Sequence, residues 1–134
     1  MPPRQKIFDL EEANTLIPRL ETMLKEFEEG HDDFKRLQDE LLFEELLADT
    51  VPSSEMESRW QTLENHLLKL ARQIGKILGL GCLLRHPEKG MVDFLSRKKD
   101  GEWICYCWRR GEKAIQYYHT LHGGFFERRP VGLV

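Results

Sequence analysis

Residues 60–81, WQTLENHLLKLARQIGKILGLG, carry the clearest structural signal in this chain of 134 residues. Apolar side chains recur there at intervals of three and four residues: Trp60, Leu63, Leu67, Leu70, Ile74 and Ile77. This spacing places them on one face of an α-helix. Gly79 and Gly81 follow directly and predict the end of that helix. The stretch therefore predicts an amphipathic helix that must bury one apolar face.

A second heptad pattern lies upstream of this stretch. Apolar residues recur every seven positions and at the positions between: Ala13, Leu16, Ile17, Leu20, Met23, Leu24, Phe27, Phe34, Leu37 and Leu41. Asp9 and Glu12 form a capping-box pattern, and Phe8 stands where a hydrophobic staple begins. We expect one long helix from about residue 10 to 48, kinked at Pro18 and weakened at Gly30. The alternative is two helices that meet near Gly30.

The two heptad patterns are separated by a short polar stretch. Residues 49–53 predict a turn, and Ser54 with Glu57 predicts a new helix start. Helices joined by so short a turn fold back antiparallel, which gives a coiled-coil-like hairpin. Further apolar residues on these helices need another surface to cover them: Leu42, Phe43, Leu46, Leu47 and Leu68. Either the C-terminal half packs there or a second chain does, and a homodimer with a four-helix core is the economical expectation.

Beyond Cys82 the apolar pattern changes from helical to alternating. Strands are predicted at residues 83–85, 91–95 and 102–109, and residues 114–119 are either a strand or a short helix. Residues 102–109 have apolar side chains on both faces, which indicates a central strand. The expectation is a single α+β domain over residues 1–134. It has a helical hairpin at 8–80 and an antiparallel β-meander of about three strands at 81–134.

Charge divides between the same two halves. Residues 1–80 hold 17 acidic and 10 basic side chains, a net of −7, whereas residues 81–134 hold 6 and 10, a net of +4. A positive surface attracts anions, so the second half favours an anionic small molecule as a partner, unless its charge simply balances the acidic helices. The apolar runs are too short for a membrane span, and no secretion signal is evident. A cytoplasmic protein with three reduced cysteines is expected.

An ordered set of residues in the second half matches a known family. The set comprises Gly90-Met91-Val92-Asp93-Phe94, Cys107-Trp108-Arg109, Gly111-Glu112, Tyr118-His119, Gly124-Phe125 and Arg128. With the opening Phe8–Asn14 and Leu16-Ile17-Pro18, it resembles a family of small, uncharacterised bacterial proteins, Domain of Unknown Function 2203. The resemblance implies a bacterial cytoplasmic protein without an assigned activity. The chain departs from the family pattern at Cys105 and His122.

The polar residues of this set suggest a site. Asp93, Glu112 and His119 can act as acids, bases or metal ligands, and arginines can hold an anion. The candidate ligand-binding residues are Trp108, Arg109, Tyr118, Phe125 and Arg128, because aromatic walls and convergent cations are typical of small-molecule pockets. The alternative is a structural network of ion pairs, Asp93 with Arg109 and Glu112 with Arg128.

Two metal sites are conceivable from the residue types. Asp93, Glu112 and His119 offer ligands to a divalent ion. Cys105, Cys107, His119 and His122 offer four donors to zinc. A Cys-x-Cys pair is a weak zinc signal, since an alternating strand often buries cysteine as a small apolar residue.

The sequence constrains the function less than it constrains the fold. The leading hypothesis is a self-associating interaction or ligand-binding module with a polar pocket in its C-terminal half. The rival is a small enzyme that uses Glu112 or Asp93 with His119 as general base, and arginine as anion anchor. Nucleic acid is a weaker candidate for a partner. Cations that would suit it are Arg97, Lys98, Lys99, Arg109, Arg110, Arg128 and Arg129, but the pI is near 6.0 and RNA-binding signatures are absent from the sequence.

Overall fold

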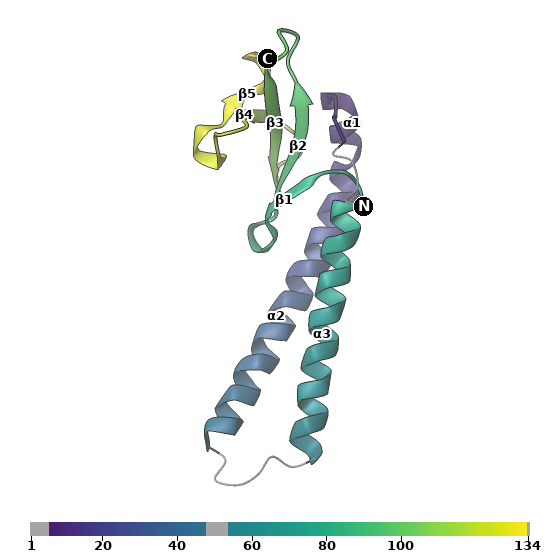
Figure 1. Cartoon of the computed structure of the whole chain (residues 1–134), viewed down its shortest axis with the longest axis vertical. Helices are drawn as coiled ribbons and strands as arrows, with labels where there is room; N and C mark the ends of the chain where they lie inside the picture. The colour runs from purple at the N-terminus through teal and green to yellow at the C-terminus, as the bar shows by residue number, and fades with distance from the viewer. Residues whose placement is uncertain (1–5, 48–53, 134) are drawn as a thin grey trace.

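A helical hairpin and a five-stranded antiparallel sheet form this α+β protein (Figure 1). The computed structural model describes residues 6–47 and 54–133. The helices are α1 (Leu10–Thr15), α2 (Ile17–Leu47) and α3 (Ser54–Leu78). The strands are β1 (Leu83–His86), β2 (Met91–Arg97), β3 (Trp103–Arg109), β4 (Tyr117–Thr120) and β5 (Arg129–Pro130). Three 3-10 turns, η1 (Pro87–Lys89), η2 (Phe125–Glu127) and η3 (Val131–Leu133), complete the described chain.

The first helix begins as its capping residues predict. The Asp9 carboxylate accepts a hydrogen bond from the Glu12 backbone N–H at 2.7 Å, and the Glu12 carboxylate accepts one from the Asp9 N–H at 3.5 Å. The expected kink at Pro18 is instead a break just before it, since α1 ends at Thr15 and α2 begins at Ile17. Pro18 thus lies in the first turn of α2, where a missing N–H costs no helical hydrogen bond.

Helix α2 runs unbroken through Gly30, so the alternative of two helices meeting there is wrong. A Cβ atom on Gly30 would lie 3.2 Å from Cδ2 of Leu70 on the facing helix. That separation is tighter than ordinary van der Waals contact. The glycine therefore weakens the helix locally but lets α3 approach it closely.

The interface between α2 and α3 is narrower than the sequence pattern suggests. On α3 the buried residues are Leu63, Leu70 and Ile77, one in every seven. Leu67, which the pattern places on the same seam, is 53% exposed. Near the tip, Arg59 of α3 hydrogen-bonds to the Glu44 carboxylate of α2. The turn predicted at residues 49–53 lies outside the described residues.

The sheet is a meander in the order β1-β2-β3-β4-β5, with two strands more than the three expected. β2 and β3 pair along their full length, from Met91 opposite Arg109 to Arg97 opposite Trp103. The ambiguous segment 114–119 contributes strand β4 rather than a helix. β5 is a two-residue edge strand, and Pro130 is tolerated there because an edge residue needs no second hydrogen-bonded neighbour.

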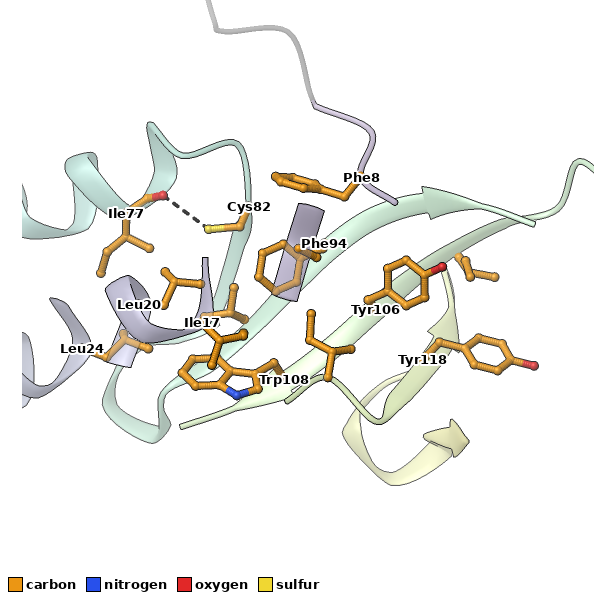
Figure 2. Close-up of a cluster of buried hydrophobic side chains, with 14 residues drawn as sticks. Phe8, Ile17, Leu20, Leu24, Ile77, Cys82, Phe94, Tyr106, Trp108 and Tyr118 are labelled. Atoms are coloured by element: carbon orange, nitrogen blue, oxygen red, sulfur yellow. Dashed lines mark hydrogen bonds between the residues drawn. The ribbon is translucent and has the colours of Figure 1, made fainter. Parts of the chain in front are cut away.

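One face of the sheet packs against α1, the start of α2 and the end of α3. Phe94, Tyr106, Trp108 and Tyr118 point from the strands into this core, where they meet Phe8, Ile17, Leu20, Leu24 and Ile77 (Figure 2). The Phe8 ring meets the Phe94 ring edge to face at 5.1 Å. The Phe8 backbone N–H also donates to the Leu95 carbonyl at 2.8 Å, which fixes the N-terminal segment to the sheet.

The other face of the sheet points away from the helices. Asp93, Cys105, Cys107 and His119 alternate with the core residues along their strands, so they project onto this outer face. The sheet occupies one end of the hairpin, and the far halves of α2 and α3 extend beyond it (Figure 1). The fold thus separates an outer sheet face at one end from a helical tip at the other.

The buried seam can be tested by truncation. We expect Leu70→Ala to lower the free energy of unfolding by about 2–5 kcal/mol, because it empties a closely packed position between the helices. Urea denaturation measures the change, with the exposed Glu64→Ala on the same helix as the control. Equal losses in the two variants would contradict the packing described here.

Candidate functional site

A buried ion-pair cluster forms the centre of the outer sheet face. The Asp93 carboxylate on β2 is 2% exposed and His119 on β4 is 3% exposed. Asp93 Oδ2 lies 3.0 Å from His119 Nε2 and 2.8 Å from Nε of Arg85 on β1. One buried carboxylate oxygen therefore holds two basic side chains from different strands.

His119 reaches Asp93 across the intervening strand β3. Adjacent strands are about 4.8 Å apart, so a side chain on β4 must cross roughly twice that distance to meet one on β2. The β3 residues on this face are Cys105, paired with His119, and Cys107, paired with Asp93. Their small side chains leave room for the imidazole to lie over the strand.

The hydrogen bonds of His119 define its protonation state. Nδ1 lies 2.7 Å from the Thr120 carbonyl oxygen, which can only accept, and Nε2 faces the Asp93 carboxylate. Both nitrogens therefore donate, as in an imidazolium ion. The bonds to Asp93 and Cys107 raise the pKa of His119 to about 10. Burial acts to raise the pKa of Asp93, but hydrogen bonds from His119 and Arg85 outweigh it, so that the pKa is lowered.

A thiol completes a group of possible metal ligands at the same place. One ligand atom each from Asp93, Cys105 and His119 lie within 4.8 Å of one another. Burial, aided by the negative charge of Asp93, raises the pKa of Cys105 to about 11, so the thiol is protonated at neutral pH. Cys82, Cys105 and Cys107 are all free and buried.

A pocket of about 540 Å³ opens above this cluster. Its described lining comes from strands β1 to β4, from the turn η1 and from the segment that follows β4: Arg85, His86, Lys89, Met91, Asp93, Cys107, Arg109, His119, Leu121, Gly123, Gly124, Phe125 and Phe126. The volume is in the range of small-molecule sites. Apolar and aromatic side chains thus share the wall with several cations.

The charges of the pocket wall do not balance. Asp93 is the single Asp or Glu among the described lining residues, and Arg85 and His119 already neutralise it. Across residues 6–47 and 54–133, no carboxylate lies within ion-pair distance of Lys89 or Arg109. The Arg109 guanidinium lies 5.7 Å from the centre of the Phe125 ring. The pocket therefore presents two cations that have no ion-pair partner among the described residues, beside an apolar wall; both also border a neighbouring hollow lined by Glu21, Glu28 and Glu88.

A second ion pair fastens the segment that covers the pocket. Arg128 Nη2 donates to both Glu112 oxygens, at 2.7 and 2.8 Å, and its guanidinium stacks on Tyr117 and Phe125. Glu112 also accepts from the Arg109 backbone N–H at 2.6 Å. The structural pair Glu112–Arg128 expected from the sequence is therefore present. In the expected pair Asp93–Arg109, Arg85 takes the place of Arg109.

The candidate ligand-binding residues divide between the two faces of the sheet. Arg109 and Phe125 line the pocket, whereas Trp108 and Tyr118 lie in the core on the helical side. The Trp108 indole N–H is occupied by the Glu112 carbonyl at 2.9 Å. Arg128 lies behind Phe125 in its pair with Glu112.

Neither metal set drawn from the sequence is assembled as a whole in the described structure. Asp93 and His119 of the divalent set meet, but Glu112 pairs with Arg128 and is not in their group. From the zinc set, Cys105 and His119 meet with Asp93 as the third ligand, and His122 is exposed. The group that the structure does bring together therefore takes Asp93 from the divalent set, Cys105 from the zinc set, and His119, which belongs to both.

Several pocket residues were not found by sequence reasoning, above all Arg85, Lys89 and Phe126. The sequence does hold a signal for Arg85. It lies two residues after Leu83 in a predicted strand, so both side chains are expected on the same face of the sheet, and Leu83 pairs with Asp93 of the outer face. Lys89 and Phe126 lie in 3-10 turns, for which the alternation of a strand gives no information. Phe126 is 99% exposed at the rim of the pocket.

The fold and the site define a class of protein: an α+β domain in which a helical hairpin supports a sheet with a cationic pocket on its free face. A family model described as "Uncharacterized conserved protein (DUF2203)" matches residues 6–131, and the chain belongs to this family. Neither a curated protein nor a solved structure matches it significantly. Within the described residues, no helix combines the length with the apolar character that crossing a bilayer requires.

The ion pair of His119 predicts how stability changes with pH. Because the folded protein holds this proton more tightly than the unfolded chain, the contribution of His119 is complete below about pH 6.5. It is lost as the pH rises toward 10. We expect urea unfolding of the metal-free protein to show this decline, and His119→Gln to remove that part of it. Parallel pH profiles for the two proteins would contradict the assignment.

Proposed function

We propose that this protein is a binding module whose pocket takes a small organic anion with an apolar or aromatic body. The observation that carries the proposal is the pair of cations Lys89 and Arg109 beside the aromatic wall, neither of which has an ion-pair partner among the described residues. Both side chains are exposed, and no carboxylate of the described residues lies within ion-pair distance of either, so their charges are available to an anionic ligand. The net positive charge of residues 81–134 favours the approach of such a ligand.

The two cations and the aromatic rings suit different parts of one ligand. The planar guanidinium of Arg109 can hold a carboxylate, sulfonate or phosphate through two parallel hydrogen bonds, and Lys89 adds a point charge. Phe125, Phe126 and Leu121 offer apolar surface to the rest of the molecule. Phe126, being almost fully exposed, has the most surface to lose to such a ligand.

Binding is better supported than acid–base catalysis. A general base works best with a pKa near the working pH, and the pKa of His119 is about 10 with both ring nitrogens occupied. Asp93 is held as an ionised acceptor of two hydrogen bonds, and Glu112 is bound to Arg128. The enzyme hypothesis would require one of these pairs to open when substrate binds.

The anion pocket can be tested with an aromatic sulfonate dye, anilinonaphthalene sulfonate, whose fluorescence rises in apolar sites. We expect saturable binding that Arg109→Gln weakens about tenfold or more, since a charge-assisted hydrogen bond contributes roughly 1.5–3 kcal/mol. Lys89→Gln should weaken it as well.

The matched control is Arg36→Gln, which removes the same charge from an exposed position on α2, where Arg36 bonds to Asp33. Its affinity for the dye should equal that of the unchanged protein. Equal weakening in Arg36→Gln and Arg109→Gln would mean that the dye responds to net charge, and the proposed pocket would then be wrong.

A divalent metal ion is the second candidate ligand, supported by the group of Asp93, Cys105 and His119. Histidine that binds a metal through one nitrogen usually donates the other N–H to a carbonyl or carboxylate, as His119 Nδ1 does to Thr120. The nitrogen donor of His119 and the sulfur donor of Cys105 favour zinc over the harder divalent ions. Arg85 would remain beside the carboxylate as an outer partner.

Zinc binding would displace protons, because His119 and Cys105 are both protonated at neutral pH. We expect calorimetry with zinc in buffers of different ionisation enthalpy to report release of about two protons. Cys105→Ser should abolish binding, whereas Cys82→Ser, a change at another buried thiol, should preserve it. Equal zinc affinity in both variants would exclude this site.

A further inference from the structure

The distal half of the hairpin exposes apolar side chains that the sheet does not cover. Those on α2 are Leu42, Phe43, Leu46 and Leu47, with exposed fractions between 44% and 84%. On α3, Leu67 and Leu68 are about half exposed, at 53% and 49%. Clusters of exposed apolar side chains mark an interaction site more often than a free surface.

This exposed surface continues a face that is buried nearer the sheet. Leu24 and Leu42 are separated by about five full helical turns, so they point in the same direction from α2. Leu24 is 1% exposed and belongs to the core, whereas Leu42 is 44% exposed. Among the side-chain pairs that join the described part of α2 to the sheet half, the one farthest toward the tip is His31 with Glu88, whose Nε2 and Oε1 atoms lie 3.9 Å apart. The same helical face thus has a covered part and an open part.

From these observations we infer that a second copy of this chain covers the open part, with the two hairpins antiparallel and overlapping at their distal halves. Such a dimer is isologous, so one surface meets itself about a two-fold axis and no other partner is needed. The sheets and their pockets then lie at opposite ends of the assembly.

Charge decides between the antiparallel and the parallel arrangement. Residues 31–47 and 54–64, at the distal end, hold nine acidic and three basic side chains, a net of −6. Residues 65–78 of α3 hold three basic side chains and no acidic ones. A parallel dimer would bring two strongly acidic tips together. In the antiparallel dimer each acidic tip lies instead beside the start of the other chain's basic stretch, at Lys69.

The spacing of the apolar residues fits the antiparallel arrangement. Glu44 pairs with Arg59, and Gly30 lies against Leu70, so Leu67 is level with about residue 33 of α2. Leu46 lies about 20 Å farther toward the tip. A two-fold axis midway between these levels brings Leu46 of one copy to the level of Leu67 of the other. Each cluster of exposed leucines then meets the other cluster rather than itself.

The overlap is large enough for a reversible dimer. The part of α2 beyond His31 is about 24 Å long, and two helices side by side are about 20 Å wide. This footprint of roughly 500 Å² lies below the ~800 Å² per partner of a standard stable interface. The dimer should therefore dissociate on dilution.

Sedimentation equilibrium over a concentration series tests the association. We expect a monomer–dimer equilibrium that Leu67→Glu weakens at least tenfold. Ile7→Glu should leave it unchanged, since Ile7 has nearly the same exposure, 51%, but lies near the sheet. Circular dichroism confirms that both variants remain folded. A protein that is monomeric at all concentrations, or equal weakening in both variants, would overturn the inference.

Cysteine cross-linking tests the orientation. Leu46→Cys and Leu67→Cys are prepared as separate proteins, mixed, and oxidised mildly, while the native cysteines stay buried. Antiparallel pairing predicts a disulfide between the two different variants in the mixture and little dimer from either alone. Cross-linking of Leu46→Cys to itself would overturn the antiparallel arrangement. Dye binding to the pocket should be the same in Leu67→Glu, so failure of the dimer and failure of the pocket are separately visible.

Discussion

The burial of the Asp93 carboxylate is the constraint on which the sheet depends. An isolated charge at 2% exposure would cost several kcal/mol, so the fold must bring basic side chains to it. Arg85 and His119 do so from β1 and β4, and both must be in register with β2 for their atoms to reach one oxygen. The same requirement accounts for small residues on β3, because larger ones than Cys105 and Cys107 would block the imidazole. One carboxylate in two ion pairs thereby links three strands and limits the size of the β3 residues between them.

The two faces of the sheet serve different purposes. The inner face is apolar and joins the sheet to the helices through rings such as Phe94 and Trp108 (Figure 2). The outer face has its own polar centre, closed by the ion pair of Arg128 with Glu112. The core residue Trp108 donates a hydrogen bond to the backbone carbonyl of Glu112. Glu112, which binds Arg128 through its side chain, is therefore also tied to the core through its backbone. The pocket is therefore built on paired strands that are tied to the core, although its rim is formed by turns.

Local patterns in the sequence predict much of this fold and less of its site. The heptads at residues 13–41 and 60–77 predict the hairpin, and alternation predicts β2 and β3, because these signals depend on near neighbours alone. Leu67 shows the limit: its spacing fits the seam, but how wide a face the partner helix covers is decided by packing. Arg85 shows another, since its contact with Asp93 depends on the register of β1 against β2. The contact of His119 with Asp93 depends further on the size of the cysteines on the strand between them. The two-residue strand β5 has no pattern long enough to detect.

Because the sheet lies at one end of the hairpin, the hairpin could be longer or shorter without a change in the sheet or its pocket. The far halves of α2 and α3 extend beyond the sheet and lie beside each other (Figure 1). The contacts of the core and of the pocket therefore do not depend on how far the helices continue. A heptad inserted into each helix would move the tip outward by about 10 Å and turn its exposed face by only about 20°. The architecture can thus serve as a spacer of adjustable reach, in which a binding surface is carried at a chosen distance from a pocket that stays the same.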